Sequence, residues 1–506
     1  MKAKKIFKGM TAAAVAAVLA ASMVPMTAFA AAPANNGKFI IDTQSGIQSA
    51  DEVAIYKVAT LDTDGKYVWA WNDSIFKSGT NTSAFTDFDT IAGYDETTNA
   101  KELKALAAEL ERSVDKTQTT KTGKGATTFD NLEQGYYLVL VTSSSSDVIY
   151  QPALIAIKDN DNKSLTNVKK SEIEFDKSIT SVTPGDAAYS GHTNTVDAAQ
   201  VKVGDIIQFQ IKTQIPNYDV AIKANNDYYT AFTPFTITDT PTNMTIDTKK
   251  VVVYRSDDGT LETDTDTTLV KDTDYTISFD TNGKMTIILD KDKIMLSDTD
   301  VDGLSDFADD YIFVTLEAKL DSSALIETAN PNKADVTYSN NYATGGGSKV
   351  KQDDVNVYTT KLVVNKVDAN NKTIKLEGAK FQIKQGDKVI AEATTNENGQ
   401  ITFSGLSAGT YDLVETVAPA DYKLDSNPKT VVIDADISEK TVTFKAGTST
   451  TKVEGGLSTQ VTNNKGQSLP GTGGMGTIIF TVAGAGVVLV AGIMLIVYMK
   501  KRKIEE

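Results

Sequence analysis

Three polar residues in the last third of the chain occupy positions that a β-strand pattern would bury. Lys366, Glu415 and Asn463 each alternate with apolar residues and therefore share a strand face with them. These apolar companions are Leu362 and Val364 for the lysine, Tyr411 and Leu413 for the glutamate, and Val461 for the asparagine. In a half-buried strand that face points into the core. Because each of these polar groups is costly to bury alone, we expect the three side chains to meet.

A lysine, a carboxylic acid and a carboxamide that meet in a dry interior can react with one another. Burial favours the neutral amine and the neutral acid, and a neutral lysine is a nucleophile. Protonated Glu415 would donate a hydrogen bond to the carbonyl of Asn463 and make its carbon more electrophilic. Attack by Lys366 releases ammonia and leaves a Lys–Asn amide bond. The alternatives are a plain buried salt bridge, and Asn464 as acceptor, although Asn464 falls on the opposite face.

The same alternation picks out a second set of residues in the middle of the chain. Lys177, Asp239 and Asn340 share their strand faces with apolar residues. These are Ile173, Phe175 and Ile179 for the lysine, Phe235 and Ile237 for the aspartate, and Ala334, Val336 and Tyr338 for the asparagine. We therefore predict a Lys177–Asn340 bond with Asp239 as the acid, and Asn341 as the alternative acceptor.

Two other features are weaker. Lys57 follows Val53 and Ile55 with the same spacing, but no matching acid and asparagine stand out, so we interpret it as a surface lysine. The run from Asp298 to Asp309 approximates the spacing of a calcium loop, with Asp where Glu usually closes it. Because no clear helices flank this run, we favour an acidic, solvated loop and predict no metal.

Composition excludes several kinds of site. The 506 residues include no cysteine and one histidine, His192. Cys–His nucleophiles, zinc clusters and haem ligation are therefore excluded or nearly so, and disulfides cannot brace an exported chain. The formal net charge of −16 disfavours nucleic acid as a partner. We expect no cofactor, and no enzymatic activity beyond a single self-directed reaction.

The elements that would position these residues are mostly strands. Apolar and polar residues alternate in many short runs, and Asn-Gly or glycine-rich turns separate them, which predicts an all-β fold of tandem immunoglobulin-like sandwiches. One amphipathic helix is expected from Ala100 to Val114. We place domains at residues 31–170, 171–360 and 361–466, the last two each containing one lysine–acid–asparagine set.

The sequence predicts a targeting segment at each end. A basic start, an apolar run and Ala28-Phe29-Ala30 predict a secretory signal peptide over residues 1–30. Residues 467–506 contain Leu469-Pro470-Gly471-Thr472-Gly473, an uncharged run from Ile478 to Met499 and a basic tail. At about 1.5 Å per residue that run is long enough to span a bilayer as a transmembrane helix.

These motifs resemble those of known surface proteins. The C-terminal segment resembles the LPxTG sorting signal of Gram-positive bacteria, in which a sortase cuts between Thr and Gly. This resemblance assigns recognition to Leu469 and Pro470 and cleavage to the Thr472–Gly473 bond. The run from Tyr411 to Tyr422 matches the Tyr-x-Leu-x-Glu-Thr-x-Ala-Pro-x-x-Tyr signature of CnaB-type domains, which form the Lys–Asn bond described above.

The whole arrangement resembles a major pilin, the shaft subunit of a sortase-assembled fimbrium. The resemblance implies a cell-wall-anchored protein whose Thr472 is joined by a pilus-specific sortase to a lysine of the next subunit. The usual Val-Tyr-Pro-Lys motif is absent, so we predict Lys169 or Lys170 as that lysine, with Lys158 and Lys163 as weaker candidates. Implied partners are identical subunits, accessory pilins, a housekeeping sortase, peptidoglycan and host surface ligands. The alternative is a monomeric wall-anchored adhesin or a minor pilin.

Overall fold

A computed structural model describes most of the chain between residues 36 and 466. The described residues are 36–61, 64, 66–70, 120–143, 148–150, 153–157, 162–166, 168, 170–183, 197–216, 234–295, 306–339 and 348–466. The predicted signal peptide, the helix from Ala100 to Val114 and the sorting signal lie outside these residues. Two compact units are found, one comprising Met1–Thr359 and Ala435–Thr443, the other Thr360–Asp434 and Phe444–Glu506. Within the described ranges, no helix has the length and apolar character needed to cross a membrane.

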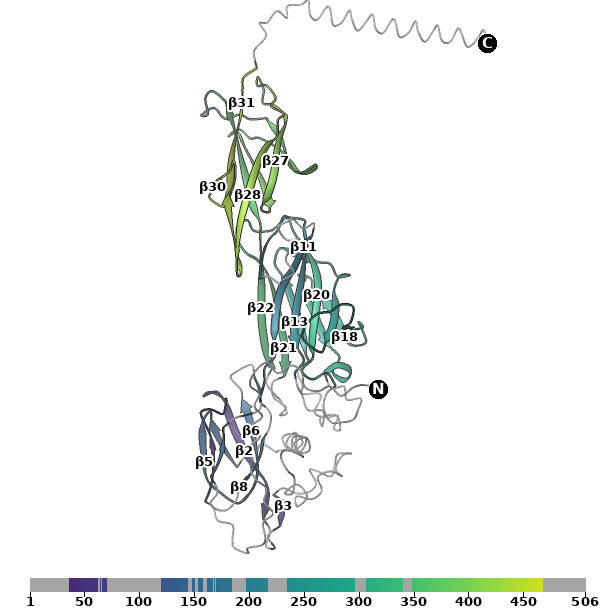
Figure 1. The fold of residues 1–506 in the computed structure, drawn as a ribbon, viewed down its shortest axis with the longest axis vertical. Helices are drawn as coiled ribbons and strands as arrows, with labels where there is room; N and C mark the ends of the chain where they lie inside the picture. The colour runs from purple at the N-terminus through teal and green to yellow at the C-terminus, as the bar shows by residue number, and fades with distance from the viewer. Residues whose placement is uncertain are drawn as a thin grey trace, which may run out of the picture. The chain divides into compact units, whose positions relative to one another are not determined.

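The first part of unit 1 is built from two main sheets and a short strand pair (Figure 1). The three-stranded sheet has the order β5 (Thr127–Leu132), β1 (Gly37–Ile41), β9 (Asn162–Leu165). The five-stranded sheet has the order β3 (Tyr67–Trp69), β2 (Glu52–Leu61), β6 (Gly135–Ser143), β8 (Ala153–Ile157), with β4 (Lys121–Lys124) also paired to β2. The pair consists of β7 (Ile149–Tyr150) and β10 (Lys170–Ser171). Alternate residues such as Phe39, Ile41, Val53 and Ile55 form the core.

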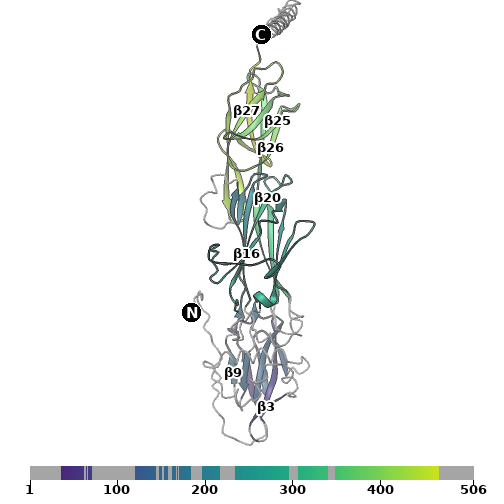
Figure 2. The same cartoon turned by 90° about the vertical axis from the view of Figure 1, so that its right-hand side faces the viewer.

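The second part of unit 1 contains two six-stranded sheets that bury a separate core. One sheet has the order β11 (Phe175–Thr183), β13 (Ile206–Gln214), β20 (Tyr311–Leu320), β16 (Val252–Ser256), β17 (Thr267–Thr268), with β15 (Met244–Ile246) beside β20. The other has the order β12 (Ala198–Gln200), β22 (Ser348–Tyr358), β21 (Asn330–Ser339), β14 (Thr236–Pro241), β19 (Met285–Leu289), β18 (Tyr275–Phe279). A single turn of π-helix, η5, covers Lys291–Met295. Figure 2 shows β16 and β20 from the side.

Strand alternation explains how this core forms. In β13, Ile207, Phe209 and Ile211 are fully buried, while the residues between them are partly exposed. Successive side chains of a strand point to opposite faces, so one strand supplies both core and surface. The same rule carries a lysine into the interior wherever it replaces an apolar residue in the alternation.

Unit 2 is a sandwich of a four-stranded and a five-stranded sheet. The first has the order β26 (Gln400–Leu406), β23 (Thr360–Asp368), β31 (Gly456–Asn463), β30 (Thr451–Val453). The second has the order β25 (Lys388–Thr394), β24 (Lys380–Gln385), β27 (Gly409–Val417), β28 (Lys429–Ser438), β29 (Thr441–Ala446), of which the tip of the β28–β29 hairpin belongs to unit 1. The predicted all-β, immunoglobulin-like class is confirmed.

One glycine holds the end of β23 in place. Gly399 lies in the predicted Asn-Gly turn with φ +65°, a left-handed conformation that side chains with a Cβ rarely adopt. Its carbonyl accepts a hydrogen bond from the backbone N–H of Lys366 at 2.7 Å. A Cβ added there would lie 2.6 Å from the carbonyl oxygen of Lys366. The turn therefore fits closely against the residue whose side chain we expect to react.

Candidate functional site

The structure brings Lys366, Glu415 and Asn463 together in the interior of unit 2. Lys366 on β23 and Asn463 on β31 lie on adjacent parallel strands, in which Lys366 pairs with Val461 and Asp368 with Asn463. Glu415 comes from β27, in the opposite sheet. The exposed fractions are 0% for the lysine and 2% for each of the other two. Two strands that meet edge to edge and one that faces them thus deliver the three groups to one point.

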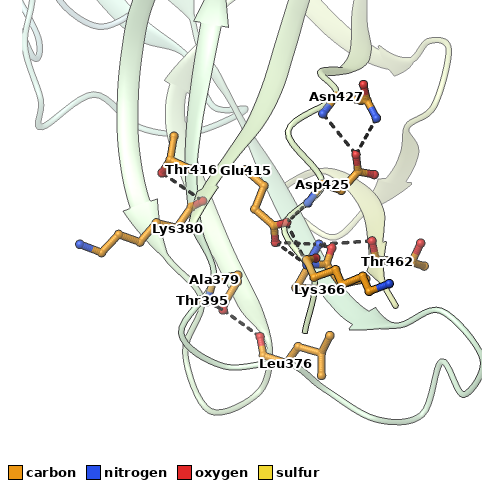
Figure 3. A network of polar contacts seen from close by, with 12 residues as sticks. Lys366, Leu376, Ala379, Lys380, Thr395, Glu415, Thr416, Asp425, Asn427 and Thr462 are labelled. Carbon is orange, nitrogen blue, oxygen red and sulfur yellow. Dashed lines mark hydrogen bonds and ion pairs between the residues drawn. The ribbon is translucent and has the colours of Figure 1, made fainter. Parts of the chain in front are cut away.

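Every polar group at this point has a partner within the site. Lys366 Nζ lies 3.0 Å from Glu415 Oε1 and donates to Asn463 Oδ1. Asn463 Nδ2 donates to both carboxylate oxygens of Glu415, at 3.0 and 2.9 Å. In Figure 3 the Glu415 side chain points toward Lys366, and the backbone N–H of Asp425 donates to Glu415 Oε2 at 2.9 Å. The amine, the acid and the carboxamide form a closed triangle.

The environment of Lys366 favours its reactive form. Burial lowers the pKa of the amine, and the hydrogen bond and charge of Glu415 oppose this effect in part. The ring of Phe381 lies 5.2 Å from Nζ and forms part of the apolar wall. A lowered pKa raises the fraction of neutral amine, which is the nucleophile that an attack on the Asn463 carbon requires.

Two tyrosines of the signature support the strands around this site. Tyr411 is fully buried and its hydroxyl donates to the carbonyl of Ser407 at 3.0 Å. Tyr422 donates to Asp368 Oδ2 at 3.0 Å, two residues beyond Lys366 on the same strand. Hydrogen bonds from the backbone N–H groups of Asn371 and Asn370, and from Tyr422, lower the pKa of Asp368. These contacts fix the end of β23, where the lysine sits.

Lys177 and Asp239 also meet, in the second part of unit 1. Both side chains are fully buried, and Lys177 Nζ contacts Asp239 Oδ2. Lys177 lies on β11 and Asp239 on β14, which belong to opposite sheets. The backbone N–H of Lys177 donates to Asp353 Oδ2 at 2.9 Å, and the ring of Phe209 lies 5.1 Å from Nζ.

Burial acts on both members of this pair. It lowers the pKa of Lys177 and raises the pKa of Asp239, and the mutual attraction of the pair opposes both shifts. Both directions favour a neutral amine beside a neutral acid. These directions are the ones expected when an amine and a carboxylic acid are buried together.

The predicted acceptors of the middle set, Asn340 and Asn341, lie outside the described residues. The described part of β21 contains two other asparagines, Asn330 and Asn332, both fully buried. Sequence reasoning missed them because it began the strand at Ala334, whereas β21 begins at Asn330. Residues 330 and 332 share the parity of Ala334, Val336 and Tyr338, but no apolar residue alternates with them to mark this run as part of the strand.

The remaining predicted residues have simpler surroundings. Lys57 is partly buried, with 15% of its side chain exposed, and forms an ion pair of 2.5 Å with Glu133 Oε2. Lys170 is exposed on β10 and its Nζ lies 3.3 Å from Glu172 Oε1, while Lys163 lies on β9. Outside the described residues are Lys158, Lys169, and the sorting residues Leu469, Pro470, Thr472 and Gly473. Of the acidic run, the described members include Asp309 in a turn, and no described group of three acidic, histidine or cysteine side chains could hold a metal ion.

Comparisons with known families agree with this organisation. Residues 360–448 match a family described as a prealbumin-like fold domain (SpaA). Residues 461–506 match the LPXTG cell wall anchor motif. The first match covers the strands that carry Lys366 and Glu415, and the second covers the predicted sorting signal.

Relatives and a solved structure extend the comparison to most of the chain. The trypsin-resistant surface T6 protein of Streptococcus pyogenes is 24% identical over 357 residues, covering 65% of this chain and 60% of that protein. Fimbrial subunit type 1 of Actinomyces viscosus is 30% identical over 184 residues, covering 28% of this chain and 32% of that protein. The chain thus spans less than two thirds of either relative. The structure of the three-domain T6 backbone pilin of Streptococcus pyogenes superposes with a TM-score of 0.56 at 17% identity, covering 85% of this chain and 98% of that one.

Proposed function

We propose that this chain, which belongs with the LPXTG-anchored pilins of Gram-positive bacteria, is the repeating subunit of a covalent pilus shaft. The anchor motif and the similarity to the T6 protein support a surface pilin. The observation that carries the mechanism is the closed, buried triangle of Lys366, Glu415 and Asn463. Such a triangle suits a protein that bears load and has no cysteine for disulfides.

Within the triangle the reaction needs no external reagent. The neutral Lys366 amine attacks the Asn463 side-chain carbon, and a new C–N bond forms. Glu415 takes a proton from the amine and delivers it to Asn463 Nδ2, which leaves as ammonia. The product is an amide that joins β23 and β31, which are neighbours in the sheet and are its first and last strands in chain order. Glu415 ends in its starting state, but Lys366 and Asn463 are consumed, so the reaction occurs once in each chain and is not enzymatic turnover.

This bond would resist both unfolding and pulling. Lys366 and Asn463 are 97 residues apart. By analogy with a disulfide that closes a loop of that size, the chain-entropy stabilisation is about 4–5 kcal/mol. Because β23 and β31 lie side by side, tension between them would pass through the covalent bond instead of the backbone hydrogen bonds. Unlike a disulfide, an amide is not reduced.

Assembly would use a second kind of amide, between subunits. A pilus-specific sortase would cut after Thr472 and transfer its carbonyl to a lysine amine of the next subunit. Lys170 suits this role because it is exposed beside β7, and Lys169 is its immediate neighbour. A housekeeping sortase would finally join the polymer to peptidoglycan, and accessory pilins would complete the fibre.

The test is the size of the protein extracted from cell walls. A shaft subunit should give a ladder of bands that survives boiling in SDS, and Lys169→Ala with Lys170→Ala should collapse the ladder to one band. The matched control is Lys124→Ala, an exposed lysine on β4 outside the candidate set, which should leave the ladder intact. A single band for the unaltered protein would reject the shaft and favour a monomeric wall-anchored adhesin or minor pilin.

A further inference from the structure

Buried side-chain atoms without hydrogen-bond partners occur on the strands that carry the middle site. Among the described residues these atoms are Ser178 Oγ, Thr213 Oγ1, Asp239 Oδ1, Asn332 Nδ2 and Asn332 Oδ1. All of them lie on β11, β13, β14 and β21, the strands around Lys177. Buried carboxamides are nearly always paired, so one with both atoms unpaired requires an explanation.

Strand register places Asn332 beside the acid of the middle site. On the antiparallel strands β14 and β21, Asp239 pairs with Ala334 and Pro241 pairs with Asn332. Asn332 is therefore the diagonal neighbour of Asp239, a separation that side chains on one face can bridge. The Asn332 carboxamide is close enough to lower the pKa of Asp239 in part, yet neither of its atoms makes a hydrogen bond of good geometry.

A second asparagine on the same strand, Asn330, has a fully hydrogen-bonded side chain and serves as a comparison for Asn332. Asn330 is just as buried, two residues away. Its Oδ1 accepts from Asn243 Nδ2 and from the N–H of Leu325, both at 2.8 Å. Its Nδ2 donates to the carbonyls of Leu325, Thr328 and Val357. Burial of an asparagine on β21 is thus compatible with full pairing, and Asn332 differs in having none.

We propose that Asn332 is the residue that Lys177 attacks, with Asp239 as the proton carrier. The proposal rests on the proposed internal amide bonds and replaces Asn340 and Asn341 as acceptors. Lys177 Nζ forms a bond to the Asn332 side-chain carbon, and the bond from that carbon to Nδ2 breaks. Asp239 moves one proton from Nζ to Nδ2, and ammonia leaves. No oxidant or other reagent is needed.

The backbone at Lys177 is linked by a hydrogen bond to the sheet that contains Asn332. Asp353 on β22 accepts the backbone N–H of Lys177, so β11 is tied to the sheet that carries Asn332. Lys440 Nζ lies 2.7 Å from Asp353 Oδ1 and holds that carboxylate in turn. The bond would join the two sheets of this sandwich across its core.

Tryptic mapping of the full, denatured chain distinguishes the acceptors directly. Lys333 separates Asn332 from Asn340, so trypsin places them in the peptides 320–333 and 334–349. A modified Lys177 resists cleavage, so it would lie within the peptide 171–202. We expect 171–202 linked to 320–333, with loss of one ammonia, about 17 Da. A link to 334–349, or a free Lys177 that is cut, would overturn the assignment.

Variants separate the two asparagines within peptide 320–333. Asn332→Ala should abolish the link, whereas Asn330→Ala and the double change Asn340→Ala with Asn341→Ala should retain it in the folded chain. A link that survives Asn332→Ala would refute the proposal. The Lys366–Asn463 peptide pair and the wall-extract ladder are read from the same protein. If they persist while Lys177 is unlinked, only the Asn332 assignment fails and the pilin function stands.

Discussion

In the two proposed sites, a buried lysine is combined with an acid and an asparagine in different strand arrangements. In unit 2 the lysine and the asparagine lie on adjacent strands, β23 and β31, and the acid faces them from the other sheet. In the middle site the acid and Asn332 lie on adjacent strands, β14 and β21, and the lysine faces them. The proposed amide formation therefore requires only that the amine, the acid and the carboxamide meet in a core that excludes water. The mechanical result differs, because one bond would join neighbouring strands and the other would join opposite sheets.

The two sites also differ in how completely their polar groups are paired. Around Lys366 the carboxamide donates to Glu415 and to the carbonyl of Lys423. Around Lys177, within the described residues, the amine pairs with Asp239 and lies 5.1 Å from the Phe209 ring, and neither atom of the Asn332 carboxamide has a hydrogen-bond partner. The acid should thus matter more for stability at the middle site, where Asp239 is the largest source of compensation for the buried amine and Asp353 adds a smaller one.

The largest effect is expected from Asp239→Ala. This change removes the proton carrier and also leaves the Lys177 amine without its partner in a fully buried position. Loss of one partner of a buried pair typically costs about 3–5 kcal/mol, and the stabilisation by the cross-link is lost as well. After allowing for the substitution itself, intact mass should be higher by one retained ammonia, and the melting temperature of the middle sandwich should fall strongly. A mass that differs from the unaltered chain by the substitution alone would show that Asp239 plays no part in the bond.

A somewhat smaller effect is expected from Glu415→Ala. The bond between Lys366 and Asn463 should not form, and unit 2 should lose about 4–5 kcal/mol of chain-entropy stabilisation. The Lys366 amine would keep its contact with Asn463 Oδ1, so the penalty for an unpaired amine should be less than at Lys177. Mass spectrometry and thermal unfolding of both variants, measured side by side, check this ranking. A larger loss for Glu415→Ala than for Asp239→Ala would contradict the comparison.

Strand parity predicted most of both sites because a strand has a fixed two-residue repeat. Lys366, Glu415 and Asn463 follow directly from it, and the structure brings them together; Lys177 and Asp239 follow in the same way. Asn332 did not, because the polar run before Ala334 contains no apolar alternation. It becomes a strand only because β14 and β22 pair with it on both sides, which is tertiary information. The first domain shows the same limit, since the Lys57–Glu133 ion pair joins residues 76 positions apart with no shared motif.

The smallest effect concerns Tyr422, which with Asp368 supports the end of β23, as Asp353 supports β11 at the middle site. Asp368 has a lowered pKa, so its contribution to stability is present above the ordinary aspartate value and is lost as the pH falls through the folded value. Tyr422→Phe removes one of the hydrogen bonds that stabilise the charged form. The melting temperature of unit 2 should therefore decrease slightly near neutral pH and depend less on pH in the acid range.

Because Tyr422 supports the end of β23 and does not touch the reacting atoms, the Lys366–Asn463 bond should still form in Tyr422→Phe. Intact mass should thus equal that of the unaltered chain after allowing for the lost oxygen. A variant mass higher by one retained ammonia would mean that the bond had not formed, and that the hydrogen bond from Tyr422 to Asp368 is needed to position β23. Bond formation in unit 2 would then depend on the support that Tyr422 gives to β23 through Asp368.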